Sequence, residues 1–313
     1  MEFLELIKTG KNSWWRYLVD IVVIFLFFVA GFLSTLILGL LNIINLPNIS
    51  FDFEELVLRG VGPFGYFLPM TMAYAVIISG VFFCVRFLHK RHPFSLITSK
   101  PYFSWKVVFI SFALYLFFSL LETGYYIWEN PHLYKINEVG IAKIVNFTIS
   151  FFMFFSLQVF LEELIHRGYL LQLGWLLFRN KYLAILVSAL IFMWGHNAKD
   201  IYTALYFMAD GVILGIIVLL TNGLEIPLGV HFAHNFWTIF VIYYTHIPEE
   251  YNAGLLINTV STTRSADLLD IFFVALKVLL IYIIIIKTVK DRNDSKNADK
   301  LVVQEPPNTA RSG

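Results

Sequence analysis

Eight apolar segments, each about long enough to cross a membrane, occupy most of this 313-residue chain. A spanning α-helix needs about 20 predominantly apolar residues. Because hydrophobic residues make up 58% of the sequence and charged residues only 14%, a soluble globule of this size would lack polar side chains to cover its surface. We therefore predict an all-α fold, a polytopic transmembrane helical bundle of about eight spans. The predicted spans are residues 17–45, 65–89, 106–128, 142–170, 182–198, 201–221, 224–246 and 268–288.

The distribution of Lys and Arg predicts how this bundle is oriented. If the N-terminus lies inside, sixteen of these residues fall on the inner side and five on the outer side, as expected from the basic bias of cytoplasmic loops. We expect a multi-pass protein of the cell membrane with both termini inside. His89 falls in a basic inner loop and is expected to be solvated. The net charge of +1 gives no footprint for nucleic-acid binding, so the lipid bilayer and molecules associated with it are the expected partners.

Glu162, Glu163, His166 and Arg167 lie close together in the fourth predicted span, in the stretch FFMFFSLQVFLEELIHRGYLLQLGWLL. A carboxylate at bilayer depth costs about 2.5–3.5 kcal/mol on insertion scales, so it usually faces a polar interior and has a function. Glu163 and Arg167 stand at i, i+4 and are expected to form an ion pair on one helix face. Glu162 then points elsewhere, and we expect it to face a reaction cavity. The spacing also allows Glu162, Glu163, His166 and Arg167 to form one purely structural network.

Imidazole and amide groups occur in two further spans of the same part of the chain. His196 ends the fifth span, and His231 and Asn235 share a helix face in the seventh span at i, i+4. A single buried histidine is more often a satisfied core residue than a catalyst. Here several histidines, an asparagine and two glutamates gather between residues 142 and 246, which favours a functional site.

The same residues resemble the motifs of the CPBP family, the CAAX prenyl proteases and bacteriocin-processing or self-immunity (Abi-type) membrane proteins. The stretch EELIHRGYLLQL, from Glu162, is similar to the family's EExxxR motif. Phe192 to His196 matches FxxxH, and His231 to Asn235 matches HxxxN. Each motif alone is weak, but three in the same order with consistent spacing are specific. The resemblance covers residues 142–246.

What the resemblance implies is an intramembrane endopeptidase acting on membrane-associated protein or peptide substrates. In its terms, Glu162 and His196 activate a water molecule, while His231 and Asn235 stabilise the oxyanion. The chemistry is reasonable, since peptide hydrolysis needs a base beside a water and hydrogen-bond donors aimed at the developing negative charge. No cofactor is required in this mechanism.

The resemblance gives Glu163 and Arg167 a supporting role, but other interpretations of the polar cluster stay open. His196, His231 and one glutamate could instead hold a zinc ion with water as the fourth ligand, although no HExxH motif is present. A non-catalytic membrane scaffold or a bacteriocin self-immunity protein would use the cluster for packing. A transporter with a proton relay would also place Glu and His in the membrane.

We expect four regions along the chain. They are an N-terminal three-span region at 1–130, a CPBP-type protease core at 140–246, an outer loop and last span at 247–288, and a disordered cytoplasmic tail at 289–313. Within the core, Gly211 and Gly215 form a small-xxx-small pattern, which predicts close approach of two helices.

Overall fold

The computed structural model describes residues 2–45, 50–52, 57–60, 62–241, 253–258 and 268–303, and it is all-α as predicted. Its α-helices are α1 (Trp14–Asn45), α2 (Pro63–Phe83), α3 (Trp105–Glu129), α4 (Ile141–Glu163), α5 (Leu171–Phe178), α6 (Lys181–Gly195), α7 (Ile201–Thr221), α8 (Glu225–Phe236) and α9 (Leu268–Val303). Short 3₁₀ segments are η1 (Phe3–Thr9), η3 (Pro93–Leu96) and η4 (Pro131–Leu133), and π-helical segments are η2 (Cys84–Leu88), η5 (Leu164–Leu170) and η6 (Trp237–Val241).

Six helices in the described part of the chain are long and apolar enough to cross a membrane. They are Trp14–Ser34, Gly65–Leu88, Trp105–Glu129, Ile141–Phe178, Ile201–Thr221 and Leu268–Lys287. The fifth predicted span is the shorter apolar helix α6, and the seventh is α8 with η6, whose predicted last residues, 242–246, lie outside the described residues. A count of eight spans therefore stays a prediction, as does the orientation.

The last helix extends further than expected. α9 continues to Val303, so it runs into the segment predicted as a disordered tail from residue 289. The sequence contains neither Gly nor Pro between Leu268 and Pro306, so no residue in this stretch interrupts helical hydrogen bonding. Residues 304–313 lie outside the described residues.

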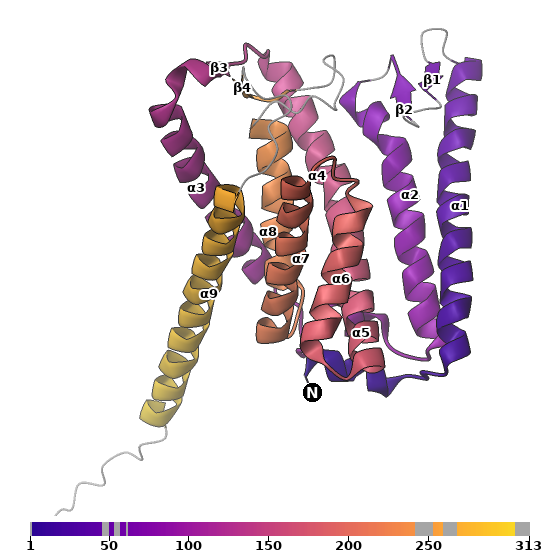
Figure 1. The fold of residues 1–313 in the computed structure, drawn as a ribbon, viewed down its shortest axis with the longest axis vertical. Helices are drawn as coiled ribbons and strands as arrows, with labels where there is room; N and C mark the ends of the chain where they lie inside the picture. The colour runs from indigo at the N-terminus through magenta and orange to yellow at the C-terminus, as the bar shows by residue number, and fades with distance from the viewer. Residues whose placement is uncertain are drawn as a thin grey trace, which may run out of the picture.

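Two small antiparallel sheets lie at one end of the bundle, and the N-terminus lies at the other (Figure 1). Strands β1 (Ser50–Asp52) and β2 (Val57–Arg59) pair with each other. Strand β3 (Tyr134–Ile136) pairs with β4 (Leu256–Asn258), which links the segment after α3 to the segment before α9. Figure 1 also shows α6 and α7 ending well below the level of these strands, so the turn after α6 lies deeper than the other connections at that end.

Glycines allow two helix pairs to approach closely. A Cβ atom at Gly211 would lie 2.9 Å from the Cα atom of Ala189, and one at Gly215 would lie 3.3 Å from the Ile185 side chain. The predicted close contact of a helix at Gly211 and Gly215 is thus confirmed, and it joins α7 to α6. On α8, a Cβ atom at Gly229 would lie 2.3 Å from a backbone oxygen of α3. These contacts fix α7 and α8 relative to their neighbours.

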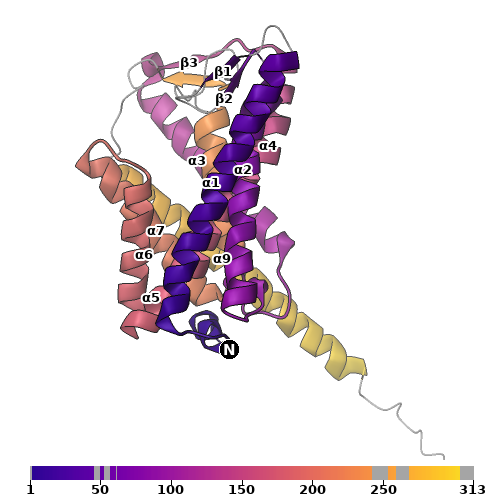
Figure 2. The same cartoon turned by 90° about the vertical axis from the view of Figure 1, so that its right-hand side faces the viewer.

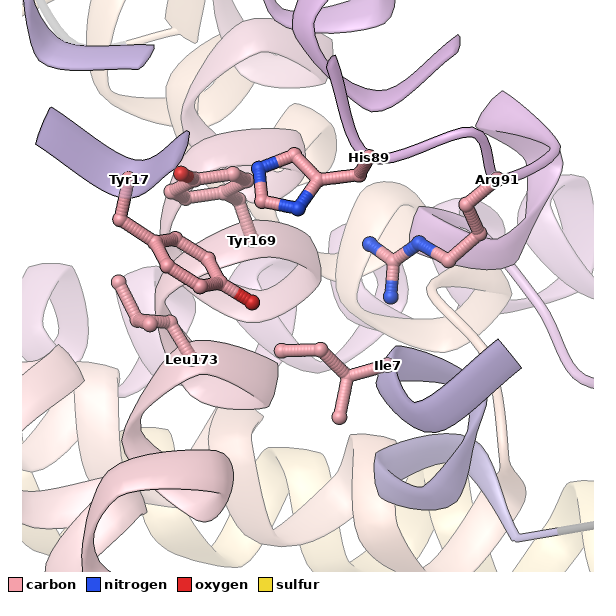
Figure 3. A pocket seen from close by; sticks show the side chains of 6 residues that line it. All are labelled: Ile7, Tyr17, His89, Arg91, Tyr169 and Leu173. Carbon is pink, nitrogen blue, oxygen red and sulfur yellow. The ribbon is translucent and has the colours of Figure 1, made fainter. Parts of the chain in front are cut away.

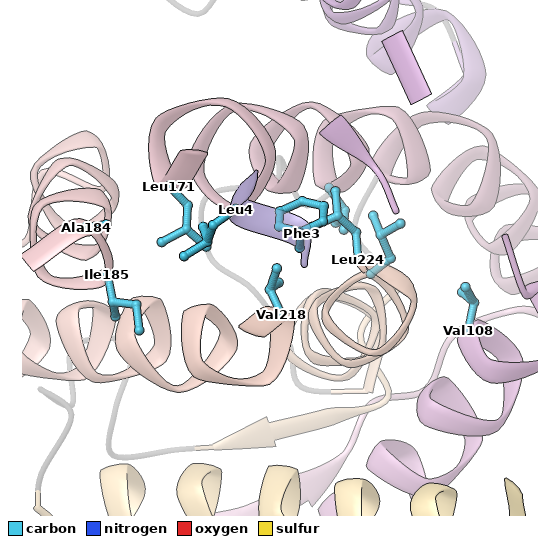
Figure 4. Packing of buried hydrophobic residues seen from close by; sticks show 10 residues of the cluster. Phe3, Leu4, Val108, Leu171, Ala184, Ile185, Val218 and Leu224 are labelled. Carbon is cyan, nitrogen blue, oxygen red and sulfur yellow. The ribbon is translucent and has the colours of Figure 1, made fainter. Parts of the chain in front are cut away.

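The N-terminal segment closes the end of the bundle opposite the sheets. Phe3 and Leu4 of η1 are buried in a cluster with Leu171 and Leu224 (Figure 4). The backbone N–H of Phe3 donates to the side chain of Asn222 at 2.9 Å. The first residues of the chain are therefore part of the hydrophobic core and hold α5 near the end of α7.

A buried polar network at the same end corrects the expectation for His89. Its side chain is only 4% exposed, because its Nε2 atom lies 2.6 Å from Asp20 Oδ2, to which the hydroxyl of Tyr169 also donates. Arg91, beside His89 in Figure 3, donates from Nη1 to Gln172 at 2.7 Å. Burial lowers the pKa of Arg91 to about 10, so the guanidinium stays charged at neutral pH. The loop sequence alone did not reveal the aspartate 69 residues away that binds His89.

Candidate active site

The two adjacent glutamates end α4, just where the helix changes to the π-helical segment η5. Arg167 donates from Nη1 to Glu163 Oε1 at 2.9 Å, and both side chains are buried, so the predicted i, i+4 ion pair is confirmed. His166 donates from Nδ1 to the backbone oxygen of Glu162 at 2.8 Å. His166 therefore binds the backbone of its own helix. Short π-helical segments are frequent at functional sites, and this one carries the arginine of the pair.

His231 of α8 lies between the two carboxylates. Its Nδ1 atom is 2.7 Å from Glu163 Oε1, and its Nε2 atom is 3.6 Å from Glu162 Oε2. The imidazole is only 6% exposed. Because a carboxylate accepts hydrogen bonds, Nδ1 carries a proton, which fixes the ring with Nε2 toward Glu162. Residues 68 positions apart thus form one buried contact.

The two glutamates differ in their access. Glu163 is fully buried, whereas 23% of the Glu162 side chain is exposed. Gln158, one turn earlier on α4, donates to Glu162 Oε1 at 3.0 Å. The other oxygen, Oε2, faces His231. Glu162 is therefore the carboxylate of the pair that water and a substrate can reach.

His196 stands at the end of α6, and the ring of Phe192 lies between it and His231. Its Nδ1 atom is 2.7 Å from the backbone oxygen of Phe192. Since a carbonyl only accepts, Nδ1 carries a proton, and in the neutral imidazole Nε2 is then an acceptor. The ring of Phe192 lies 4.3 Å from that of His196 and 6.1 Å from that of His231. Among the described residues, no ion pair joins His196 to Glu162.

Asn235 lies one turn beyond His231 on α8 and is half-buried. In the described part of the chain its side chain makes no hydrogen bond, so its amide is available to a ligand. His234, between them in sequence, turns to another side of the helix, where its Nδ1 atom is 3.0 Å from the hydroxyl of Tyr115 on α3. The helix face predicted to carry His231 and Asn235 therefore excludes His234.

One acidic residue of the cluster was missed from the sequence. Asp210 of α7 has an oxygen 3.6 Å from Arg167 Nη2, and 20% of its side chain is exposed. It lies inside an apolar span, and the criterion that singled out Glu162 and Glu163, a carboxylate at bilayer depth, applies to it as well.

The donor groups do not gather as a metal site would. Among the described residues, no three His, Cys, Asp or Glu side chains are placed to hold a metal ion. Catalytic zinc sites need three protein ligands around one point. The zinc interpretation stays a prediction.

One segment of the chain is similar to a known protein family. Residues 144–237 match the family described as type II CAAX prenyl endopeptidase Rce1-like. We call residues 144–237 the Rce1-like domain after this match. All six residues singled out from the motifs, and Asp210, fall within it.

The Rce1-like domain consists of most of α4, together with η5, α5, α6, α7 and α8. The uncharacterised protein YyaK of Bacillus subtilis (strain 168) is 26% identical over 232 residues, which cover 72% of this chain and 77% of YyaK. The similarity to YyaK therefore extends beyond the Rce1-like domain into other spans. No solved structure matches the chain.

Proposed function

We propose that the protein is an intramembrane endopeptidase that hydrolyses peptide bonds of membrane-associated proteins or peptides. The observation that carries this proposal is the position of His231 between Glu163, which binds its Nδ1 atom, and Glu162, which faces its Nε2 atom. Such a carboxylate–imidazole arrangement beside a second, accessible carboxylate is suited to activating water. The Rce1-like domain supports the same reaction class.

In the proposed mechanism Glu162 is the general base. It takes a proton from a water molecule as the water oxygen attacks the carbonyl carbon of the scissile bond. Collapse of the tetrahedral intermediate breaks the C–N bond, and protonated Glu162 returns the proton to the leaving nitrogen. In the neutral imidazole of His196, Nε2 provides a second acceptor for the water, because Nδ1 donates to a backbone oxygen.

The developing oxyanion needs donors, and α8 supplies two on one face. The side-chain amide of Asn235 is one, and the imidazole of His231 is the other when Nε2 carries a proton. Loss of one such donor typically lowers the rate by about 10²–10³-fold. Glu163 and Arg167 act behind this layer, since Glu163 fixes the His231 ring and Arg167 neutralises Glu163.

The location of the site indicates the kind of substrate. Glu162 lies within a helix long and apolar enough to cross a membrane, so the scissile bond must reach it within or next to the bilayer. A polypeptide with an apolar anchor meets this condition, whether the anchor is a spanning segment or a lipid. The family description names CAAX prenyl endopeptidases, so a prenylated C-terminal peptide is one substrate to examine.

A reconstituted system tests the proposal. The full-length protein in liposomes would be incubated with a library of quenched-fluorescence peptides, some carrying a farnesylated CAAX end. We expect cleavage by the wild type, loss of at least about 10²-fold in Glu162→Gln, and no effect of the chelator EDTA. Cleavage by Glu162→Gln at the wild-type rate would overturn the mechanism, and loss in EDTA with recovery on Zn²⁺ addition would replace it with the zinc version.

Comparative membrane proteomics would then name the substrate in cells. Membranes from the wild type and from a strain carrying Glu162→Ala would be compared for peptides with a new terminus. We expect at least one processed protein to accumulate uncut in the variant. Identical profiles, together with a Glu162→Ala strain that behaves as the wild type where a strain lacking the protein does not, would favour a non-catalytic scaffold or self-immunity protein.

A further inference from the structure

Arg167 is held by three different helical segments. Its Nη1 atom donates to Glu163 at 2.9 Å, and its Cζ atom lies 4.1 Å from the ring centre of Phe192 on α6. On the far side, Nη2 lies 3.6 Å from Oδ2 of Asp210 on α7. The guanidinium is only 1% exposed. These three contacts restrict the planar guanidinium to one orientation. Of the three contacting residues, Asp210 is the one that lies outside the sequence motifs.

The charges explain why a second carboxylate is needed. Glu163 Oε1 receives hydrogen bonds from both Arg167 and His231, so one oxygen is shared between two donors. Among the described residues, Arg167 Nη2 has no hydrogen-bond partner, and an oxygen of Asp210 lies 3.6 Å from it. A buried arginine with one shared counter-ion can rotate its free end toward any acceptor. A carboxylate facing Nη2 opposes this rotation and keeps Nη1 on Glu163.

The position of Asp210 follows from the packing of α7. The next residue, Gly211, lies against Ala189 of α6. One turn later on α6, Phe192 places its ring beneath the guanidinium. The close contact of the two helices therefore sets both the carboxylate and the ring against Arg167. The backbone of α7 at Asp210 is therefore held at a fixed distance from α6.

We propose that Asp210 is a positioning residue for catalysis: through Arg167 it holds Glu163 in the place where that carboxylate orients the His231 imidazole. This inference rests on the proposed function. Asp210 acts at a distance, because it contacts Arg167, and among the described residues it forms no ion pair with His231.

Kinetics of variants in liposomes test this role. With the library peptide that the wild type cuts fastest, Asp210→Asn should lower kcat by about 10–100-fold, as loss of an outer partner of a functional group does, and leave KM unchanged. Asp210→Glu keeps a carboxylate within reach of Arg167, so it should recover most of kcat. In an Arg167→Gln background, Asp210→Asn should have no further effect, because residues that act through one another are not additive.

A matched control separates positioning from general stability. Glu122→Gln also removes a carboxylate paired with a buried cation at membrane depth, since Glu122 lies 2.6 Å from Lys277 Nζ between α3 and α9. The folded fraction of this variant should cleave at the wild-type rate. A wild-type kcat in Asp210→Asn, additive losses with Arg167→Gln, or an equal loss in Glu122→Gln would each overturn the inference. Glu162→Gln in the same assay tests the proposed function separately. If Glu162→Gln cleaves as fast as the wild type, the proposed function is refuted. An inactive Glu162→Gln together with a fully active Asp210→Asn refutes only the positioning role of Asp210.

Discussion

Among the residues of the site, the two adjacent glutamates differ in burial and in the charged groups that they contact. Glu163 is fully buried, and one of its oxygens binds both Arg167 and His231. Glu162 is partly exposed and binds only Gln158 closely. A charge removed from the first leaves a buried cation without its nearest partner, whereas a charge removed from the second leaves no such group. The two positions should therefore separate stability from chemistry.

We predict that Glu163→Gln destabilises the protein while Glu162→Gln does not. Breaking a buried ion pair by neutralising one partner typically costs about 3–5 kcal/mol, so Glu163→Gln should lower Tm clearly in detergent, and cleavage should fall as His231 loses its acceptor. Glu162→Gln should keep the wild-type Tm and lose cleavage. Thermal unfolding and peptide cleavage of both variants measure this. Equal Tm values for the two variants would contradict the division.

Local pairs of the site could be read from the sequence, and distant ones could not. Helical spacing places Glu163 and Arg167 together whatever the tertiary fold, and the structure confirms their pair. Spacing contains no information about the His231 contact 68 residues away, or about Asp210. For the same reason His89 was expected in solvent, although Asp20 binds it in the interior.

At the scale of helices, apolar composition predicted which segments are helical but not where each helix ends. α6 ends at Gly195, after 15 residues, and α9 continues to Val303. Helix ends depend on caps and on neighbours: Asn180 caps the start of α6, and α6 packs along α7 through the glycines of that helix. The early end of α6 places the turn between α6 and α7 well below the level of the strands (Figures 1 and 2).

We predict that enlarging Gly211 disables the site from a distance. A leucine there would need the space of Ala189, whose Cα atom is 2.9 Å from the position of the new Cβ atom. Overpacking of this kind costs about 1–3 kcal/mol, and it would push α7, with Asp210, away from Arg167. Gly211→Leu should therefore lower both Tm and the cleavage rate.

The control for this prediction is Gly124→Leu. Gly124 lies on α3, and a Cβ atom added there meets no other heavy atom within 4 Å. Both variants exchange the same residue types within a candidate membrane span. If Gly124→Leu reduced stability and cleavage as much as Gly211→Leu, helix propensity rather than helix contact would be the cause.

For the whole molecule, elements outside the Rce1-like domain complete its packing. α3 presses against α8 at Gly229, and α8 carries His231 and Asn235. The N-terminal segment η1 fills the end of the bundle below α5. The match to YyaK, over 72% of the chain, also exceeds the domain. α3 and η1 thus support the helices that carry the site.

The orientation of this molecule is predicted from charge alone and can be measured directly. The chain has one cysteine, Cys84, which is buried, so Cys84→Ser gives a background without thiols. Single cysteines would replace Lys106, just inside the start of α3 on the predicted inner side, and Lys135 in β3 on the predicted outer side; both side chains are exposed. A membrane-impermeant maleimide applied to intact cells should label Lys135→Cys and leave Lys106→Cys unlabelled until the cells are permeabilised. The reverse pattern would mean that the sixteen-to-five excess of basic residues lies on the outer side. Substrates would then have to be anchored in the opposite orientation to reach Glu162.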